Sequence, residues 1–334
     1  MSDSTQATIK VVSTNSGFRA FIGLLSSIFM FLLVFIIGIV AGASALSASK
    51  NSNGLVQISN SQTGSSSTIA VLDVSGVIDS STATYVHEAI TEILDNKNIR
   101  AVVLRVDSPG GEVTASDEIW HDLQKIKEAK IPIIASYGSI AASGGYYISC
   151  HADSIMAQET TVTGSIGVII NVLTFQGLLE KLGVDPVTLI AKDSPEKSIA
   201  NDVYRNWTIK DKQKVRNILN AMYSVFYERV KEGRSHIIQN TKKMKAVANG
   251  SAYTAHEALE NGLIDSIGYL DDAIELASLR AGIVDSNPTV LRYSRSTPMF
   301  SGLFGLQTNG ISMSDLQTFI QNFSIPKLMY IYSQ

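Results

Sequence analysis

Cysteine, excess positive charge and clusters of metal ligands are all scarce in this sequence. Its single cysteine, Cys150, cannot form an internal disulfide and lies in an apolar stretch typical of a small core residue. The 27 Lys and Arg residues are scattered among 30 Asp and Glu residues, with a net charge of −3, so no basic stripe indicates a nucleic-acid surface. No His, Cys, Asp and Glu group has metal-ligand spacing, and no segment repeats with a fixed period. We therefore expect no nucleic-acid partner, no metal and no cofactor.

Hydrophobic residues, in contrast, make up 45% of the 334 residues, enough for one large α/β domain with extensions or for two ordinary domains. Residues 21–45 carry no charge, and this length matches the roughly 20 residues that cross a bilayer core. A cleaved secretory signal is the alternative, because Ala43-Ser44-Ala45 resembles a cleavage site. The apolar run exceeds the roughly 7–15 residues of a usual signal, so we expect a transmembrane anchor after a short cytoplasmic N-terminus, residues 1–20.

The charges that precede this span predict its orientation. Lys10 and Arg19 precede the span, and Asp3 is the one acidic residue there. Positive residues favour the cytoplasmic side, which predicts a single-pass protein of the cell membrane with its main domain on the extracytoplasmic side.

Beyond the span, residues 46–67 are rich in Ser, Asn and Gly, the composition of a flexible linker. From residue 68, strand patterns alternate with helix patterns, which is typical of a parallel sheet with crossover helices. The predicted strands are 69–74, 101–106, 131–136, 154–157 and 166–170, and the predicted helices are 83–94, 113–129, one opening at Ser143, 175–182 and 209–232.

Two of the predicted strands end in turns of small residues. The strand 131–136 leads to Ala141-Ala142-Ser143-Gly144-Gly145, where one hydroxyl lies among residues with almost no side chain. A substrate backbone can approach such a hydroxyl closely, so Ser143 is a candidate nucleophile. The strand 101–106 leads to Asp107-Ser108-Pro109-Gly110-Gly111, where a glycine pair can turn backbone N–H groups toward an oxyanion. Together the two turns indicate acyl transfer.

A serine nucleophile needs a base, and histidine is the usual one. None of the five histidines follows a turn or a strand end of the predicted sheet, so we interpret all of them as structural: His87, His121, His151, His236 and His256. A neutral lysine is the other possible base. Lys192 and Lys197, between Leu189 and Trp207, are the two candidates.

Three motifs in this order closely resemble the signal peptide peptidase A family of serine proteases, peptidase family S49. They are Asp107-Ser108-Pro109-Gly110-Gly111-Glu112-Val113, Ala141-Ala142-Ser143-Gly144-Gly145-Tyr146-Tyr147-Ile148 and Thr163-Gly164-Ser165-Ile166-Gly167-Val168. The resemblance covers residues 68–283 and leaves residues 284–334 as a C-terminal extension. It implies a Clp protease/crotonase-like ββα spiral and a Ser-Lys dyad without histidine.

The resemblance also implies roles for individual residues. Ser143 matches the nucleophile, and Lys197 matches the general base better than Lys192, although the letters around Lys197 depart from the family pattern. Ser165 matches the serine that orients the lysine amine. The N–H groups of Gly111 and Gly144 would form the oxyanion hole.

The sequence thus predicts a membrane-anchored serine endopeptidase that cleaves released signal peptides or other extended apolar peptides. The resemblance further implies a ring-like homo-oligomer, with contacts expected from the helix 209–232 and the apolar C-terminal tail. Two alternatives remain. One is a crotonase-like acyl-CoA enzyme that holds a thioester enolate with the same glycine pair, and the other is a catalytically lapsed membrane scaffold with a protease fold.

Overall fold

A computed structural model describes residues 55–60, 67–198, 202–283, 288–295 and 329–331. The strands are β1 (Leu55–Asn60), β2 (Thr68–Ser75), β3 (Ile99–Ser108), β4 (Gly110–Glu112), β5 (Ile133–Ala142), β6 (Ser154–Ala157), β7 (Val162–Gly164), β8 (Ala252–Thr254), β9 (Ser266–Ile267), β10 (Thr289–Arg295) and β11 (Met329–Ile331). The helices are α2 (Ser80–Asp95), α3 (Val113–Glu128), α4 (Gly144–Ser149), α5 (Gln176–Leu182), α6 (Ile209–Gly233), α7 (Thr241–Val247), α8 (Ala255–Asn261) and α9 (Leu270–Arg280).

The main sheet has nine strands, and its central path runs β1-β10-β2-β3-β5-β6-β9. The pairs β10-β2, β2-β3, β3-β5, β5-β6 and β6-β9 are parallel, whereas β1 joins β10 in antiparallel orientation. Off this path, β7 pairs in parallel with the end of β5 and antiparallel with β8. A second, two-stranded sheet pairs β11 antiparallel with β4. The result is a mixed α/β sheet with helices, which fits a Clp protease-like fold.

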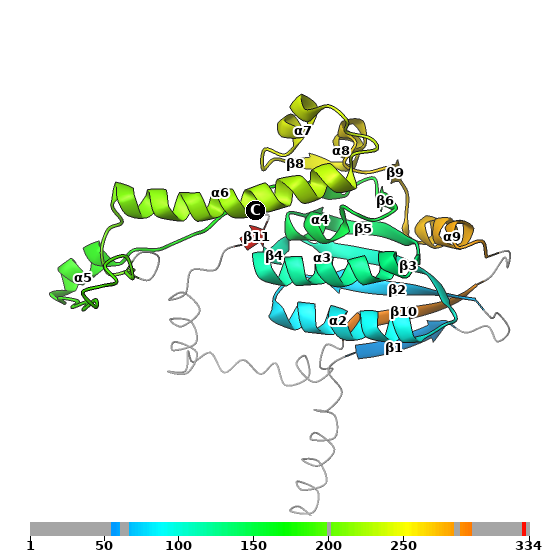
Figure 1. Ribbon diagram of the computed structural model, residues 1–334, viewed down its shortest axis with the longest axis horizontal. Coiled ribbons are helices and arrows are strands. Elements are labelled where there is room, and N and C mark those ends of the chain that lie inside the picture. Colours follow the sequence, from blue (N-terminus) through cyan, green and yellow to red (C-terminus); the bar gives the residue numbers. More distant parts are fainter. Residues whose placement is uncertain (1–54, 61–66, 199–201, 284–287, 296–328, 332–334) are drawn as a thin grey trace, which may run out of the picture. The chain divides into compact units, whose positions relative to one another are not determined.

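Helices cover both faces of the sheet (Figure 1). The larger apolar core lies on the side of α2, α3 and α4, where alternate residues of β3 such as Val102, Leu104 and Val106 point toward these helices. The smaller core lies on the other side, where Val103 of β3 packs with Ala273 and Ala277 of α9. Because alternate residues of one strand are buried on opposite faces, β3 is apolar on both sides, as expected for a parallel sheet covered by helices.

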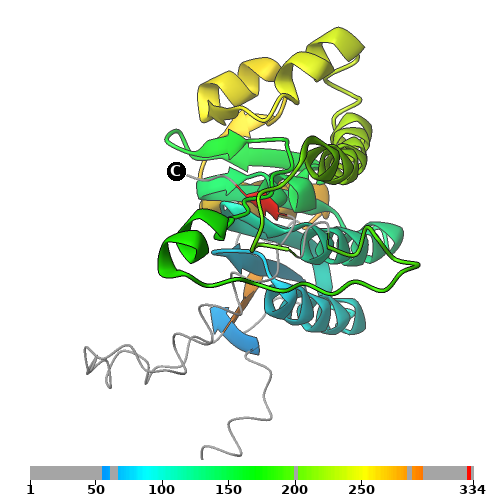
Figure 2. The ribbon, with the colours of Figure 1, turned by 90° about the vertical axis from the view of Figure 1, so that its left-hand side faces the viewer.

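The helices begin and end where the sequence supplies caps. The side chain of Asp79 accepts the N–H of Thr82 at 2.8 Å at the start of α2, and Thr208 and Asp211 form a capping box at the start of α6. Gly262, with a φ of 80°, ends α8 in the left-handed conformation. Figure 2 shows α7 and α8 stacked at the end of the sheet that carries β8.

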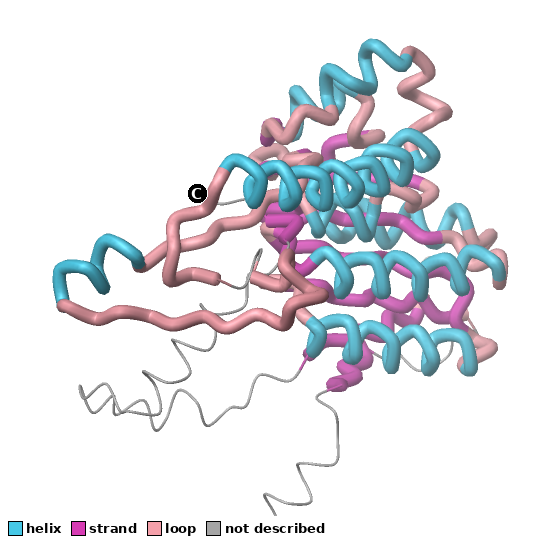
Figure 3. Tube along the Cα trace, turned by 60° about the vertical axis from the view of Figure 1, so that its left-hand side comes forward, coloured by secondary structure: helices cyan, strands magenta, loops and turns pink. Residues whose placement is uncertain are grey.

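A long segment between β7 and α6 contains α5 and extends away from the sheet (Figure 3). We call residues 168–198 and 202–208 the arm. Apolar side chains on it are unusually exposed: Leu173 is 58% exposed, Leu182 65%, Val187 81% and Leu189 91%. The second half of α6, in contrast, is firmly packed, since Phe226 and Val230 are buried and Arg234 bonds both carboxylate oxygens of Asp265 at 2.9 Å.

Most predicted elements match observed ones, and the following differences concern the limits of the predicted domain and the candidate site. The strand predicted at 166–170 is observed at Val162–Gly164, because Gly164 and Ser165 take positive φ angles that end the strand. β1 lies within the predicted linker, residues 46–67, and pairs with β10. β10 itself lies beyond residue 283, so the sheet extends past both ends of the predicted peptidase range.

The predicted anchor, residues 21–45, lies outside the described residues. In the part of the chain that the structure describes, no helix combines the length and apolarity needed to cross a membrane.

Candidate active site

Ser143 lies between the end of β5 and the start of α4, with a φ of 53° and a ψ of −114°. Positive φ is uncommon for a residue with a side chain and marks a sharp strand-to-helix turn. The N–H of Ser143 donates to the carbonyl oxygen of Gly164 at 2.8 Å, and its own carbonyl oxygen accepts from the N–H of Tyr147 at 2.8 Å. The turn is therefore fixed on both sides. The hydroxyl is buried and has no hydrogen-bond partner in the described structure.

The two glycines after Ser143 allow α4 to approach the β3–β4 turn closely. A Cβ added to Gly144 would lie 2.7 Å from Ser116 Oγ and 3.1 Å from the backbone nitrogen of Gly111. A Cβ added to Gly145 would lie 2.8 Å from the carbonyl oxygen of Ser108. Larger residues would push the two turns apart, so both glycines are needed to bring Ser143 next to Gly111.

Gly111 lies in β4 between two neighbouring backbones. On one edge, Ile78 donates its N–H to Gly110 and accepts the N–H of Glu112, at 2.9 and 2.8 Å, and a Cβ on Gly111 would lie only 1.9 Å from the carbonyl oxygen of Ile78. Successive peptide groups of a strand point to opposite edges, so the N–H of Gly111 faces the other edge. That edge pairs with β11, where Tyr330 lies opposite Gly111.

Ser165 follows directly after Gly164, whose carbonyl oxygen holds the N–H of Ser143. It is 8% exposed, has a φ of 51° and donates its N–H to the carbonyl oxygen of Ser251 at 2.7 Å. The pairing of Ala142 with Gly164 aligns β7 with the end of β5. The fold thus brings Ser143, Gly144, Gly111 and Ser165 to one end of β5, although they come from three separate motifs.

Lys197 makes no hydrogen bond with the hydroxyl of Ser143 in the described structure. It lies on the arm in a turn where its N–H donates to the carbonyl oxygen of Ser194 at 3.0 Å, and its side chain is exposed. The neighbouring Glu196 pairs with Lys214 at 2.9 Å and Lys210 at 3.2 Å, and hydrogen bonds from these lysines lower the pKa of Glu196. Lys192 is exposed on the same arm. Since the hydroxyl of Ser143 has no partner in the described structure, neither lysine bonds it there.

The histidines with described polar contacts bond to groups other than Ser143. His87 lies 3.0 Å from Asp122, and His151 lies 2.7 Å from the carbonyl oxygen of Arg229. Burial lowers the pKa of His151, which favours its neutral form. His236 and His256 each lie 3.7 Å from a carboxylate, Asp265 and Glu159 respectively. Within the described ranges, no group of three or more His, Cys, Asp and Glu side chains could hold a metal ion.

The remaining residues of α4 anchor the turn in the core. The hydroxyl of Tyr146 donates to the carbonyl oxygen of Leu263 at 2.8 Å, and that of Tyr147 donates to Asp117 at 2.5 Å. Cys150 is fully buried, and burial raises the pKa of its thiol to about 12. The thiol therefore stays protonated near neutral pH and does not compete with Ser143 as a nucleophile.

Two supporting residues were not predicted from the sequence. Ser116 lies beneath Gly144 and donates its hydroxyl to the carbonyl oxygen of Glu112 at 2.9 Å. Ser251 holds Ser165 through a backbone carbonyl, a role that any residue type can play. Neither has a sequence signal, because their contacts depend on how distant segments meet.

Comparison with known protein families gives two matches. The family described as Peptidase family S49 matches residues 125–283, and the family described as NfeD1b, N-terminal domain, matches residues 68–172. The two matches overlap and together include all five candidate site residues.

Similar individual proteins include a putative signal peptide peptidase SppA from Enterococcus faecium, 37% identical over 64% of this chain and 59% of that protein. The putative protease slr0021 from Synechocystis is 34% identical over 77% of this chain and 88% of that protein. Among solved structures, the 1510-N membrane-bound stomatin-specific protease matches with a TM-score of 0.45 and 19% identity, over 70% of this chain and 100% of that one.

Proposed function

Because the chain belongs to peptidase family S49, the signal peptide peptidase A family, we propose that it is a serine endopeptidase with Ser143 as nucleophile and Lys197 as general base. The observation that carries this proposal is the geometry of Ser143. Ser143 follows β5 beside Gly111, on a turn with a strained φ whose backbone N–H and carbonyl groups are both hydrogen-bonded. Its hydroxyl has no hydrogen-bond partner in the described structure.

The proposed reaction is acyl transfer. Neutral Lys197 takes the hydroxyl proton of Ser143, and the oxygen attacks the carbonyl carbon of a peptide bond. The N–H groups of Gly111 and Gly144 stabilise the oxyanion, which collapses as the protonated Lys197 gives its proton to the leaving amine and becomes neutral again. Water, deprotonated by the same lysine, then releases the acyl group and restores Ser143. The N–H of Ser143 takes no part in the oxyanion hole, because Gly164 already accepts it.

We propose that the dyad forms in a homo-oligomer. The exposed apolar side chains of the arm favour such an assembly, since Val187 and Leu189 are 81% and 91% exposed in one chain. An assembly that covers the arm would also remove water from Lys197, and desolvation favours a neutral lysine. A ring with an enclosed interior would admit extended chains and exclude folded proteins.

The edge of β4 supports an extended peptide as substrate. A short strand of the same chain, β11, pairs there antiparallel, with Tyr330 opposite Gly111. A substrate strand that replaced β11 at this edge would run past Gly111 and bring its carbonyl groups close to Ser143. Signal peptides and other extended apolar segments fit this mode of binding. We further propose that residues 21–45 anchor the protein in the cell membrane, where released signal peptides concentrate, and that the peptidase domain lies on the extracytoplasmic side.

Labelling with a fluorophosphonate probe tests this function. Wild-type protein should be labelled at Ser143 and should hydrolyse an extended apolar peptide, whereas Ser143→Ala should do neither. Hydrolysis that survives in Ser143→Ala would refute the mechanism. Turnover of an acyl-CoA thioester without labelling would favour a crotonase-like enzyme, and absence of both activities would favour a lapsed scaffold.

A further inference from the structure

The turn that follows α7, residues 247–251, supports Ser165 from outside β7. The carbonyl oxygen of Ser251 accepts the N–H of Ser165 at 2.7 Å. If Gly164 had a Cβ, that atom would lie 3.1 Å from the same oxygen. If Gly167 had a Cβ, that atom would lie 3.4 Å from the Cα of Gly250. Because Ser165 has a positive φ that serine rarely adopts, this close packing helps to hold it in place.

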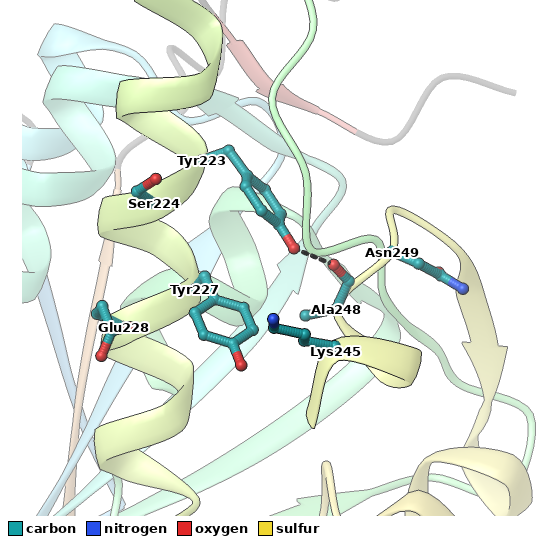
Figure 4. A pocket seen from close by; sticks show the side chains of 7 residues that line it. All are labelled: Tyr223, Ser224, Tyr227, Glu228, Lys245, Ala248 and Asn249. Carbon is teal, nitrogen blue, oxygen red and sulfur yellow. Dashed lines mark hydrogen bonds between the residues drawn. The ribbon is translucent and has the colours of Figure 1, made fainter. Parts of the chain in front are cut away.

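Tyrosine hydroxyls bond to this turn from two different elements. Tyr223 of α6 donates to the carbonyl oxygen of Ala248 at 2.5 Å (Figure 4). Tyr253 of β8 donates to the carbonyl oxygen of Val247 at 3.1 Å. Within the turn, the side chain of Asn249 accepts the N–H of Ser251 at 2.8 Å. Tyr223 thus connects α6 to the turn three residues before the carbonyl group that holds Ser165.

A second tyrosine on α6 makes no such connection. Tyr227 lies one helical turn after Tyr223, and the centroids of the two rings are 6.2 Å apart. Both rings line a cavity of about 440 Å³ between α6 and α7 (Figure 4). The hydroxyl of Tyr227 is buried and has no hydrogen-bond partner in the described structure. The two tyrosines therefore share a helix and a cavity but differ in their bond to the turn.

We propose that Tyr223 is a positioning residue for catalysis, a proposal that rests on the proposed role of Ser165 in orienting the lysine amine. The hydroxyl of Tyr223 donates a hydrogen bond to the carbonyl oxygen of Ala248, which limits the movement of the turn up to Ser251. The carbonyl oxygen of Ser251 in turn accepts the N–H of Ser165 and so restrains its backbone. Tyr223 touches neither substrate nor reacting atoms. Its loss leaves the β4 edge and the N–H of Gly111 unchanged, so substrate binding is retained while proton transfer slows.

Steady-state kinetics of the full-length protein in detergent micelles, with an extended apolar peptide as substrate, test the proposal. Tyr223→Phe removes one hydrogen bond and should lower kcat roughly threefold to tenfold with KM unchanged. Tyr227→Phe removes a hydroxyl without a partner and should keep the wild-type kcat, which makes it the matched control. In a Ser165→Gly background, Tyr223→Phe should cause no further loss, because both changes act through the same hydroxyl.

Three results would overturn the role of Tyr223. One is an unchanged kcat in Tyr223→Phe, and another is an equal loss in Tyr223→Phe and Tyr227→Phe. The third is a full additional loss in the Ser165→Gly background. Failure of the proposed function gives a different result, since hydrolysis would then be absent from the wild-type protein or would persist in Ser143→Ala, whatever Tyr223 does.

Discussion

The two residues of the proposed dyad lie in opposite environments. Ser143 is fully buried at the end of a central strand, and its backbone is bonded to Gly164 and Tyr147. Lys197 lies exposed on an arm whose apolar side chains face solvent in one chain. One chain therefore brings together the proposed nucleophile, oxyanion donors and orienting serine. The difference suggests that the base depends on assembly, whereas the nucleophile depends on folding alone.

Removing the nucleophile should have the largest effect. Ser143→Ala is expected to lower peptide hydrolysis by about 10⁴-fold or more, because the acyl-enzyme can no longer form. The variant should keep or raise its melting temperature, since the lost hydroxyl is buried and makes no hydrogen bond in the described structure. Differential scanning fluorimetry provides the control. A variant that unfolds would indicate that Ser143 has a structural role as well.

Replacing Lys197 tests the exposed member of the proposed dyad. Lys197→Ala should reduce hydrolysis nearly as much as Ser143→Ala, and Lys197→Arg should not restore it, because arginine keeps its proton near neutral pH. Lys192→Ala, on the same arm, is the matched control and should retain most activity. The reverse order of the two alanine variants would assign the base to Lys192.

Disrupting the proposed oligomer tests whether the activity of Ser143 depends on assembly through the arm. Leu189→Asp places a charge on the most exposed apolar side chain of the arm and should yield monomers with little activity. Leu279→Asp, at a 75% exposed position on α9, is the control and should leave the oligomer intact. Light scattering and hydrolysis are measured together. A fully active Leu189→Asp monomer would show that the dyad forms within one chain.

Removing the orienting hydroxyl should have the smallest effect. Glycine tolerates the positive φ of residue 165, so Ser165→Gly removes the hydroxyl without backbone strain. Loss of a hydrogen bond to the amine should lower kcat about tenfold. Labelling by a fluorophosphonate should slow by a similar factor. An unchanged kcat would leave Ser165 with a turn-forming role only.

The sequence was a good guide to the packed part of the fold. Periodic apolar residues predicted α2, α3, β3 and α6, because their burial patterns repeat locally along the chain. The strand at Val162–Gly164 was misplaced, since the backbone reversal at Ser165 depends on the distant Ser251. The motifs around Gly111 and Ser143 could be found because small residues must lie where backbones meet closely, whereas Ser165 was assigned through the family resemblance.

The position of Lys197 could not be predicted in the same way. The arm has a helix signal at α5 but few packing partners within the chain, so no burial pattern fixes its path. Likewise, β1 lies in a segment that composition assigned to a linker, and β11 lies in the extension that the family resemblance left over. Both strands owe their pairing to neighbours distant in sequence.

The backbone angle of Ser143 also has a consequence for stability. By conformation alone, glycine would suit a turn with a φ of 53°, and a residue with a side chain costs about 1–3 kcal/mol there. Burial of a hydroxyl without a partner adds to this cost. A glycine at this position would make a more durable protein that could not form an acyl-enzyme. Under the proposed mechanism, thermal stability and turnover therefore favour different residues at this position.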